Sequence, residues 1–361
     1  MILKTYIQYI TKTYVLNFIK VFFIFFSLIF ILNIFEEIGY FKDTDRSIFF
    51  IIFMTFLNVP SVIYLITPFI FLITTQAFFM DIFRKDELIV FKTNGLSNIK
   101  ILKILISISI VMALLMSFFL YNFSSKLQFL YLDFKNQHSK DNKYLAIVTE
   151  NGLWIKDEID GNINLINSAK MERNILRGVT ITVLDKEFKL IKNITASEVD
   201  IGETTWVVKR AKIVNFDSTL VKEKDELIFK TSLDYKKINS LFSNLSSLTF
   251  FELKKLRKSY SELGYSTDDL DIHTQKLYSH PVYMVIMTLL ASIIMLNVKR
   301  SHENYFYIIL GVSISVMIYY IIYLFSLLGL SGRLPIVLSA WLPLLIIILI
   351  SSVGIVKLNE K

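Results

Sequence analysis

The sequence predicts a membrane protein with six transmembrane α-helices and an all-β domain inserted between the third and fourth helices. Hydrophobic residues make up 54% of the 361-residue chain and charged residues only 19%, whereas soluble domains average about 45–50% and 25%. Six long runs have almost no charged residues, and each approaches the roughly 20 residues that span a bilayer. A polar stretch with the alternating pattern of strands separates the third run from the fourth.

The first span is predicted at Val21–Phe35 and gains full length when Tyr14–Lys20 joins it, with the Lys20 ammonium at the near interface. A cleaved signal peptide is the alternative, but the run is longer than a signal's apolar region and no small-residue cleavage site follows it. Glu36 and Glu37 come after this span and are expected at the outer interface, where carboxylates stay hydrated.

The second run, Ser47–Met80, is too short for two spans joined by a turn. We expect one long helix bent at Pro60 and Pro68, whose freed carbonyls bond to neighbouring helices or to Ser and Thr side chains. A re-entrant hairpin is the alternative. The remaining spans are predicted at Ile104–Ser125, Pro281–Val298, Asn304–Gly332 and Leu334–Val356.

This layout divides the chain into three parts. Residues 1–125 hold the first three spans and a short cytoplasmic helix at about 84–97, residues 126–270 form the external β domain, and residues 271–361 hold the last three spans. Lys and Arg favour cytoplasmic loops. They are more numerous in one set of loops (Arg84, Lys85, Lys92, Lys100, Lys103, Lys299 and Arg300) than in the other (Lys42, Arg46 and Arg333). Both termini are therefore predicted in the cytoplasm and the β domain outside.

The external domain alternates polar and apolar residues in short segments. Strands are predicted at Tyr144–Thr149, Leu153–Ile155, Val179–Val183, Phe188–Ile191 and Thr205–Ile213. Several short strands at this spacing indicate a sandwich, a jelly roll or a similar β fold, with Trp154 and Trp206 in its core. At Thr249–Tyr265 the apolar period changes to that of an amphipathic helix, which ends the domain.

The cytoplasmic segment 84–97 combines charges with a small apolar side made of Leu88, Ile89, Phe91 and Leu96. Asn94 and Gly95 are a helix-stop signal. Such a helix could insert its apolar side into the groove of a partner protein. Equally, it could lie flat on the bilayer surface.

Several function classes are excluded. The chain has no cysteine and only four histidines, which lie apart, so a metal-centred or thiol enzyme is not expected. There is no phosphate-binding glycine loop, so we expect no cofactor on this chain and any ATP hydrolysis on another one. The basic residues are interleaved with acidic ones, so nucleic acid is not implied. Ion-coupled transport is disfavoured because the second to sixth runs have no ionisable group at midplane depth.

Four segments resemble the LptF/LptG family of lipopolysaccharide permeases. Glu87, Leu88, Gly95 and Ser97 match that family's coupling helix between the second and third spans, and Leu57–Pro60 fits its second helix. Two further stretches, Asn151–Lys156 in the external domain and Lys276–Pro281 at the fourth span, look more like LptG than LptF.

This resemblance implies a fold, a set of partners and a location. The external domain would be a periplasmic β-jellyroll that passes lipopolysaccharide to an LptC/LptA-like bridge. The spans would pair with an LptF-like second permease around a lipid cavity, in the inner membrane of a Gram-negative bacterium. An LptB-like ATPase dimer, which carries the ATP and Mg²⁺, would bind the coupling helix through Glu87, Leu88, Phe91, Gly95 and Ser97.

The resemblance also implies which residues contact lipid. Where LptG proteins can carry a Lys in the first helix, this chain has Asn33, so we expect the lipid phosphates to meet bases at the outer rim and the acyl chains to lie deeper. The expected lipid-contact residues are Asn33, Lys42, Arg46, Lys126, Lys135, Phe22 and Phe25, of which Lys135 matches a basic position of the family. An aromatic and basic interface belt is the alternative for Lys126 and Lys135. A membrane-anchored β-domain scaffold or sensor without transport is the alternative function.

Overall fold

The structure is a computed structural model, and it describes residues 2–42, 47–138, 153–159, 161–172, 174–215, 221–231, 233, 235, 238, 244–263, 266–297 and 304–359. The chain divides into two units. The helical unit comprises residues 1–128 and 268–361, and the sheet unit comprises residues 129–267.

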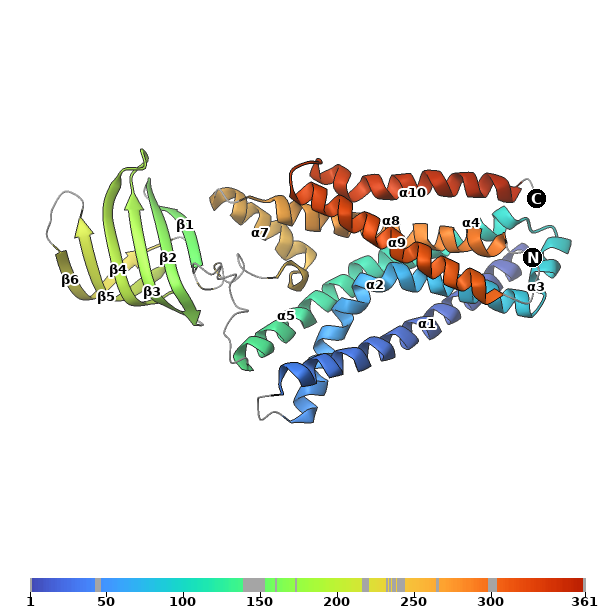
Figure 1. The fold of residues 1–361 in the computed structure, drawn as a ribbon, viewed down its shortest axis with the longest axis horizontal. Coiled ribbons are helices and arrows are strands. Elements are labelled where there is room, and N and C mark those ends of the chain that lie inside the picture. Colours follow the sequence, from blue (N-terminus) through green and yellow to red (C-terminus); the bar gives the residue numbers. More distant parts are fainter. Residues whose placement is uncertain are drawn as a thin grey trace. The chain divides into compact units, whose positions relative to one another are not determined.

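Six helices in the described residues are long and apolar enough to cross a membrane, as predicted (Figure 1). The first two are α1 (Ile2–Tyr40) and α2 (Ile48–Arg84), and the third span joins α4 (Asn98–Leu115), the π-helical turn η1 (Met116–Leu120) and α5 (Tyr121–His138). The last three are α8 (Asp268–Leu296), α9 (Asn304–Leu330) and α10 (Ile336–Asn359). The first helix starts earlier than its apolar run suggested and continues without a break past Phe35.

The second run is one helix, which confirms the prediction and excludes the hairpin. Pro68 has no N–H, so the carbonyl of Tyr64 lacks its helical donor. The Thr67 hydroxyl donates to that oxygen at 2.7 Å, and His280 Nε2 of α8 lies 3.1 Å from it. Because a carbonyl oxygen only accepts, His280 Nε2 carries the hydrogen. A neighbouring helix thus replaces the hydrogen bond that the proline removes.

α2 is the centre of the helical unit and packs against α1, α8 and α9. Among the described residues, three apolar clusters fill the spaces between these helices. One of them, here called the α3 cluster, includes Ile10, Tyr14, Phe78, Phe79, Phe91, Leu96, Ile101, Leu105 and Met295. By contrast, α1 and α9 expose large apolar side chains such as Phe23, Ile24, Phe306 and Met317, as expected for surfaces that face lipid or another membrane protein.

The sheet unit contains one six-stranded antiparallel sheet. Its strands are β1 (Leu153–Ile159), β2 (Asn162–Glu172), β3 (Ile175–Leu184), β4 (Leu190–Asp200), β5 (Thr205–Asn215) and β6 (Val221–Lys230). They lie side by side in sequence order (Figure 1). The all-β insert between the third and fourth spans is therefore confirmed, and its described strands follow a meander, a simpler order than the Greek-key crossing of many jelly rolls.

Three of the predicted strands coincide with β1, β3 and β5, and Tyr144–Thr149 lies outside the described residues. The strand predicted at Phe188–Ile191 was placed too early: it reaches only the first two residues of β4, because Phe188, with a φ of 61°, lies in the turn before that strand. β2 and β6 were not predicted, because β2 carries asparagines and β6 carries a run of charges. The helix predicted at Thr249–Tyr265 is α7 (Phe250–Leu263). At its start the Thr249 N–H and hydroxyl both donate to Glu252 Oε2, at 2.8 and 2.6 Å, so the carboxylate half of a capping box is formed.

One face of the sheet is buried. Trp206 is fully buried and its indole N–H donates to the Leu233 carbonyl at 2.8 Å, which confirms its place in the core. Trp154 is 56% exposed, so the same expectation for it was wrong. Side chains alternate across a strand, and Leu153 and Ile155 occupy the buried positions on either side of Trp154.

Candidate functional site

The segment matched to a coupling helix forms a short helix, α3 (Glu87–Thr93), between α2 and α4. It ends at a Schellman motif, as Asn94 and Gly95 predicted: the Gly95 N–H donates to the Lys92 carbonyl at 3.0 Å and the Leu96 N–H to the Phe91 carbonyl at 2.9 Å. Gly95 has a φ of 82°, which favours glycine. Figure 1 shows α3 at the same end of the helical unit as the start of α1 and the end of α10.

Ser97 begins the next helix. Its hydroxyl accepts a hydrogen bond from the Lys100 N–H at 3.3 Å, so it is the N-cap of α4. The Lys100 ammonium in turn donates to the Gly95 carbonyl at 3.2 Å. Gly95 and Ser97 together set the sharp exit of the chain from α3 into the third span.

The apolar side of α3 is turned into the chain itself. Phe91 and Leu96 are 9% and 5% exposed in the α3 cluster, and Leu88 packs against the same cluster. Phe91 and Leu96 are therefore covered by this chain, whereas Leu88 keeps partial exposure. The exposed apolar residues of α3 are instead Ile89 and Val90, at 44% and 54%.

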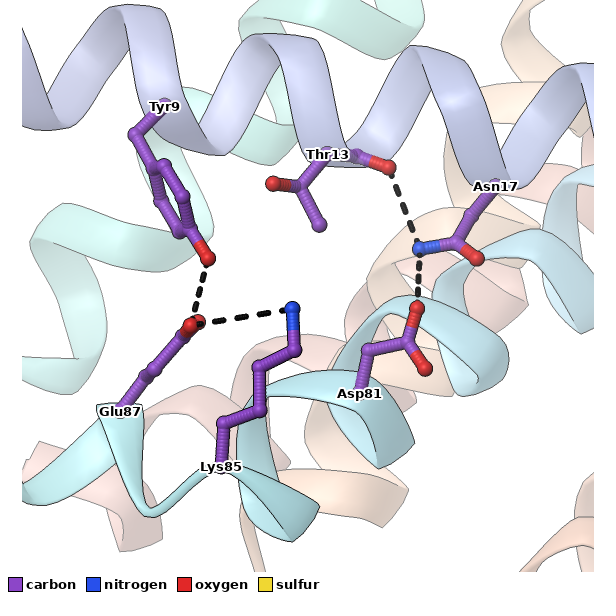
Figure 2. Close-up of polar contacts among 6 residues, drawn as sticks. All are labelled: Tyr9, Thr13, Asn17, Asp81, Lys85 and Glu87. Carbon is purple, nitrogen blue, oxygen red and sulfur yellow. Dashed lines mark hydrogen bonds and ion pairs between the residues drawn. The ribbon is translucent and has the colours of Figure 1, made fainter.

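Glu87 is linked to the first helix (Figure 2). Its Oε1 accepts a hydrogen bond from the Tyr9 hydroxyl at 2.5 Å, and the Lys85 ammonium lies 3.9 Å from the same oxygen. The Glu87 side chain is still 22% exposed. Farther along α1, Asn17 Nδ2 donates to Asp81 Oδ2 at 2.9 Å and to the Thr13 carbonyl at 3.1 Å.

Asn33 is bonded to groups of this chain. It is 7% exposed, its Oδ1 accepts from Asn58 Nδ2 at 2.7 Å, and its own amide nitrogen donates to the Ile29 carbonyl at 3.1 Å. The side chain thus ties α1 to α2. Glu37 is fully buried rather than at an open interface, contrary to expectation.

The structure separates the expected rim bases. Lys42 and Lys126 are exposed in the helical unit, and Arg46 lies outside the described residues. Lys135 belongs to the sheet unit, is only 8% exposed and places its ammonium against the hydroxyl and the ring of Tyr131. Of these three lysines, Lys42 and Lys126 are thus exposed and Lys135 is buried with a partner.

Phe22 and Phe25 are half-buried on α1 and pack against the cluster between α1 and α2. The Phe25 and Phe69 rings make an edge-to-face contact with centroids 5.5 Å apart. Both phenylalanines retain partial exposure, whereas Phe23 and Ile24 are 61% and 64% exposed on the same helix.

The bundle contains a buried hydroxyl cluster that was not predicted from the sequence. The Tyr14 hydroxyl lies 3.3 Å from each of the hydroxyls of Thr75, Ser109 and Thr288, and all four residues are fully buried. The cluster joins α1, α2, α4 and α8. Its only signal in the sequence is single hydroxyl residues inside apolar runs, which is also the pattern of ordinary membrane helices.

The described residues contain no group of three or more His, Asp or Glu side chains that could hold a metal ion. A comparison with curated proteins finds no match to this sequence. A family model described as "Lipopolysaccharide export system permease LptF/LptG" matches residues 8–357. This match spans all six candidate membrane helices and the inserted sheet. The chain therefore belongs to the LptF/LptG family of lipopolysaccharide export permeases.

Proposed function

We propose that this chain is an LptG-type permease subunit of an ATP-driven transporter that extracts lipopolysaccharide from the inner membrane and passes it to a periplasmic bridge. The observation that carries the permease assignment is the family match over residues 8–357. The choice of LptG over LptF rests on the likeness of Asn151–Lys156 and Lys276–Pro281 to that type. The six apolar helices and the inserted sheet support the permease assignment. Lipid extraction needs a part within the bilayer that takes up the lipid and a part outside the bilayer that receives it.

Energy enters the proposed transporter from a separate LptB-like ATPase dimer, which binds the ATP and Mg²⁺. α3 is the contact for that dimer, because it is a short helix set between two spans with Ile89, Val90 and part of Glu87 exposed. Gly95 and Ser97 hold the helix at a fixed angle to α4. Phe91 and Leu88 do not contact the ATPase in this proposal, and they hold α3 in place by packing in the α3 cluster.

The lipid cavity forms between this chain and an LptF-like second permease. Phe22 and Phe25 would contact acyl chains, since both are apolar and partly exposed on α1. Lys42 and Lys126 would meet the phosphates. Lys126→Glu tests the phosphate role, because Lys126 is exposed and the fold should tolerate the change. Lys135→Glu would instead bury a carboxylate and disrupt the fold.

The sheet unit hands the lipid to an LptC/LptA-like bridge and is periplasmic in this proposal, with both termini in the cytoplasm. The lysine and arginine distribution supports that orientation. The placement of α3 at the same end of the helical unit as the start of α1 and the end of α10 agrees with a single cytoplasmic end (Figure 1).

Purification of the tagged chain from native membranes in mild detergent tests the proposal. We expect a second permease and an ATPase to elute with it in a stable complex, together with ATPase activity and bound lipopolysaccharide. Elution of the chain without an ATPase and without lipopolysaccharide would instead support a membrane-anchored scaffold or sensor.

A further inference from the structure

The start of α1 and α3 are joined by two contacts of Tyr9 and by a shared buried cluster. The Tyr9 hydroxyl donates to Glu87 Oε1 at 2.5 Å, and the Tyr9 ring meets the Phe91 ring edge-to-face with centroids 6.4 Å apart. Beneath them, Ile10 and Phe91 lie in the same buried cluster. Figure 2 shows the tyrosine pointing from α1 toward the glutamate at the start of α3.

A second polar link holds α1 against the end of α2. Asn17 Nδ2 donates to Asp81 Oδ2 at 2.9 Å and is fixed by the Thr13 carbonyl at 3.1 Å. Asn17 is 5% exposed, so water competes little for this bond. Tyr9 and Asn17 are about 12 Å apart along the helix axis. Two links at that separation prevent α1 from both sliding and turning relative to the α2–α3 corner.

The two links differ in solvent exposure and in the helix that each one attaches to α1. Asp81 is part of α2, which already packs along α1. Glu87 belongs to α3, and its contact with the Lys85 ammonium, at 3.9 Å, is weaker than its hydrogen bond with Tyr9. A hydrogen bond to a carboxylate is stronger than one between neutral groups. The Tyr9 hydroxyl is therefore the main directional contact that fixes Glu87, and with it the start of α3, to the first helix.

We propose that Tyr9 is a positioning residue that couples α1 to α3, so that a displacement of α3 by the ATPase moves α1 with it. This inference rests on the proposed function. α1 is one uninterrupted helix from Ile2 to Tyr40, so a displacement at Tyr9 is carried along it to the Asn33–Asn58 hydrogen bond. The carboxylate of Glu87 on α3 transmits the movement, and the hydroxyl of Tyr9 on α1 receives it.

The chain offers a matched control. Tyr6 lies one turn earlier on α1 and packs against the same cluster, and its hydroxyl has no hydrogen bond in the described part of the chain. Tyr9→Phe and Tyr6→Phe each remove one hydroxyl and keep the ring. In the purified complex of both permeases and the ATPase, we expect Tyr9→Phe to lower the lipopolysaccharide released per ATP hydrolysed roughly threefold or more, and Tyr6→Phe to leave this ratio unchanged.

Two further measurements separate positioning from a general structural defect. In a Glu87→Ala background, Tyr9→Phe should cause no additional loss, because its acceptor is gone. Spin labels at the exposed positions Lys12→Cys and Thr93→Cys should report the same distance between α1 and α3 with and without trapped ATP. In Tyr9→Phe that distance should change or broaden when ATP is trapped. The absence of native cysteine in this chain makes the labelling specific.

The outcomes are distinct. If the unaltered complex releases no lipopolysaccharide with ATP, the proposed function fails. If it does release lipid, the coupling role of Tyr9 is overturned by equal ratios in Tyr9→Phe and Tyr6→Phe, by losses that multiply in the Glu87→Ala background, or by an α1–α3 distance that responds to ATP in the unaltered chain.

Discussion

A hydrogen bond that one residue of the helical unit removes is replaced by a residue on another helix. Pro68 removes a donor from α2, and His280 of α8 supplies one to the Tyr64 carbonyl. The sequence predicted that the freed carbonyl would be bonded by a neighbour or by a Ser or Thr side chain, and the structure shows both. Which neighbour it would be could not be predicted, because residues 216 positions apart meet only in the folded bundle.

His280→Ala should therefore lower the stability of the helical unit by about 1 kcal/mol. In a Pro68→Ala background the restored N–H bonds the Tyr64 carbonyl, so the same histidine change should cost clearly less. Thermal unfolding in detergent measures both effects. Equal losses in the two backgrounds would show that His280 does not serve the proline-freed carbonyl.

Gly95 is required for its backbone conformation and not for space. Its φ is 82°, and a Cβ there would meet nothing within 4 Å. We expect Gly95→Ala to cost about 1–2 kcal/mol, the usual penalty for a left-handed residue with a side chain. Gly39→Ala is the matched control, because its surroundings are equally open and its backbone is not left-handed. A similar melting temperature for both variants would contradict this account of the turn.

At the level of elements, the end of α3 could be predicted from the sequence and its orientation could not. The Asn94–Gly95 stop signal predicted where the helix ends. The apolar pattern showed that one side is covered, but a pattern does not say whether the cover is another protein or the chain's own core. The same limit explains Trp154, whose strand was predicted while its exposed face was not.

The outward apolar residues of α3 should carry the contact with the ATPase. Ile89→Asp and Val90→Asp place a charge at 44% and 54% exposed positions, so the fold should tolerate them. We expect each to weaken ATPase association roughly tenfold, as for a residue near the centre of an interface. Ile228→Asp is the control, because Ile228 is 71% exposed on β6 of the sheet unit. Co-purification of the ATPase at unaltered levels with both α3 variants would place the contact elsewhere.

At the scale of the whole molecule, hydropathy predicted the number of spans and the position of the insert. Charge distribution predicted an orientation, with Ser97 and His302 cytoplasmic and Asp157 and Asp225 periplasmic. The structure guides the choice of probes. Ser97 and Asp225 are exposed, Asp157 is fully buried, and His302 lies outside the described residues.

Single-cysteine labelling tests this topology. In intact spheroplasts, a membrane-impermeant reagent should label Asp225→Cys and should not label Ser97→Cys until the membrane is opened. Both positions react when accessible, and the chain has no other cysteine. Labelling of Ser97→Cys from outside would show that the orientation is the opposite one. A cytoplasmic ATPase could then not reach α3.

The central claim is that this chain moves lipopolysaccharide out of a bilayer at the expense of ATP. Its most direct test uses proteoliposomes that contain the purified complex and lipopolysaccharide, with a soluble acceptor of the bridge type outside. We predict transfer of lipopolysaccharide to the acceptor that starts on addition of ATP and is lost without it. Lipopolysaccharide that stays in the bilayer while the bound ATPase hydrolyses ATP would contradict the claim.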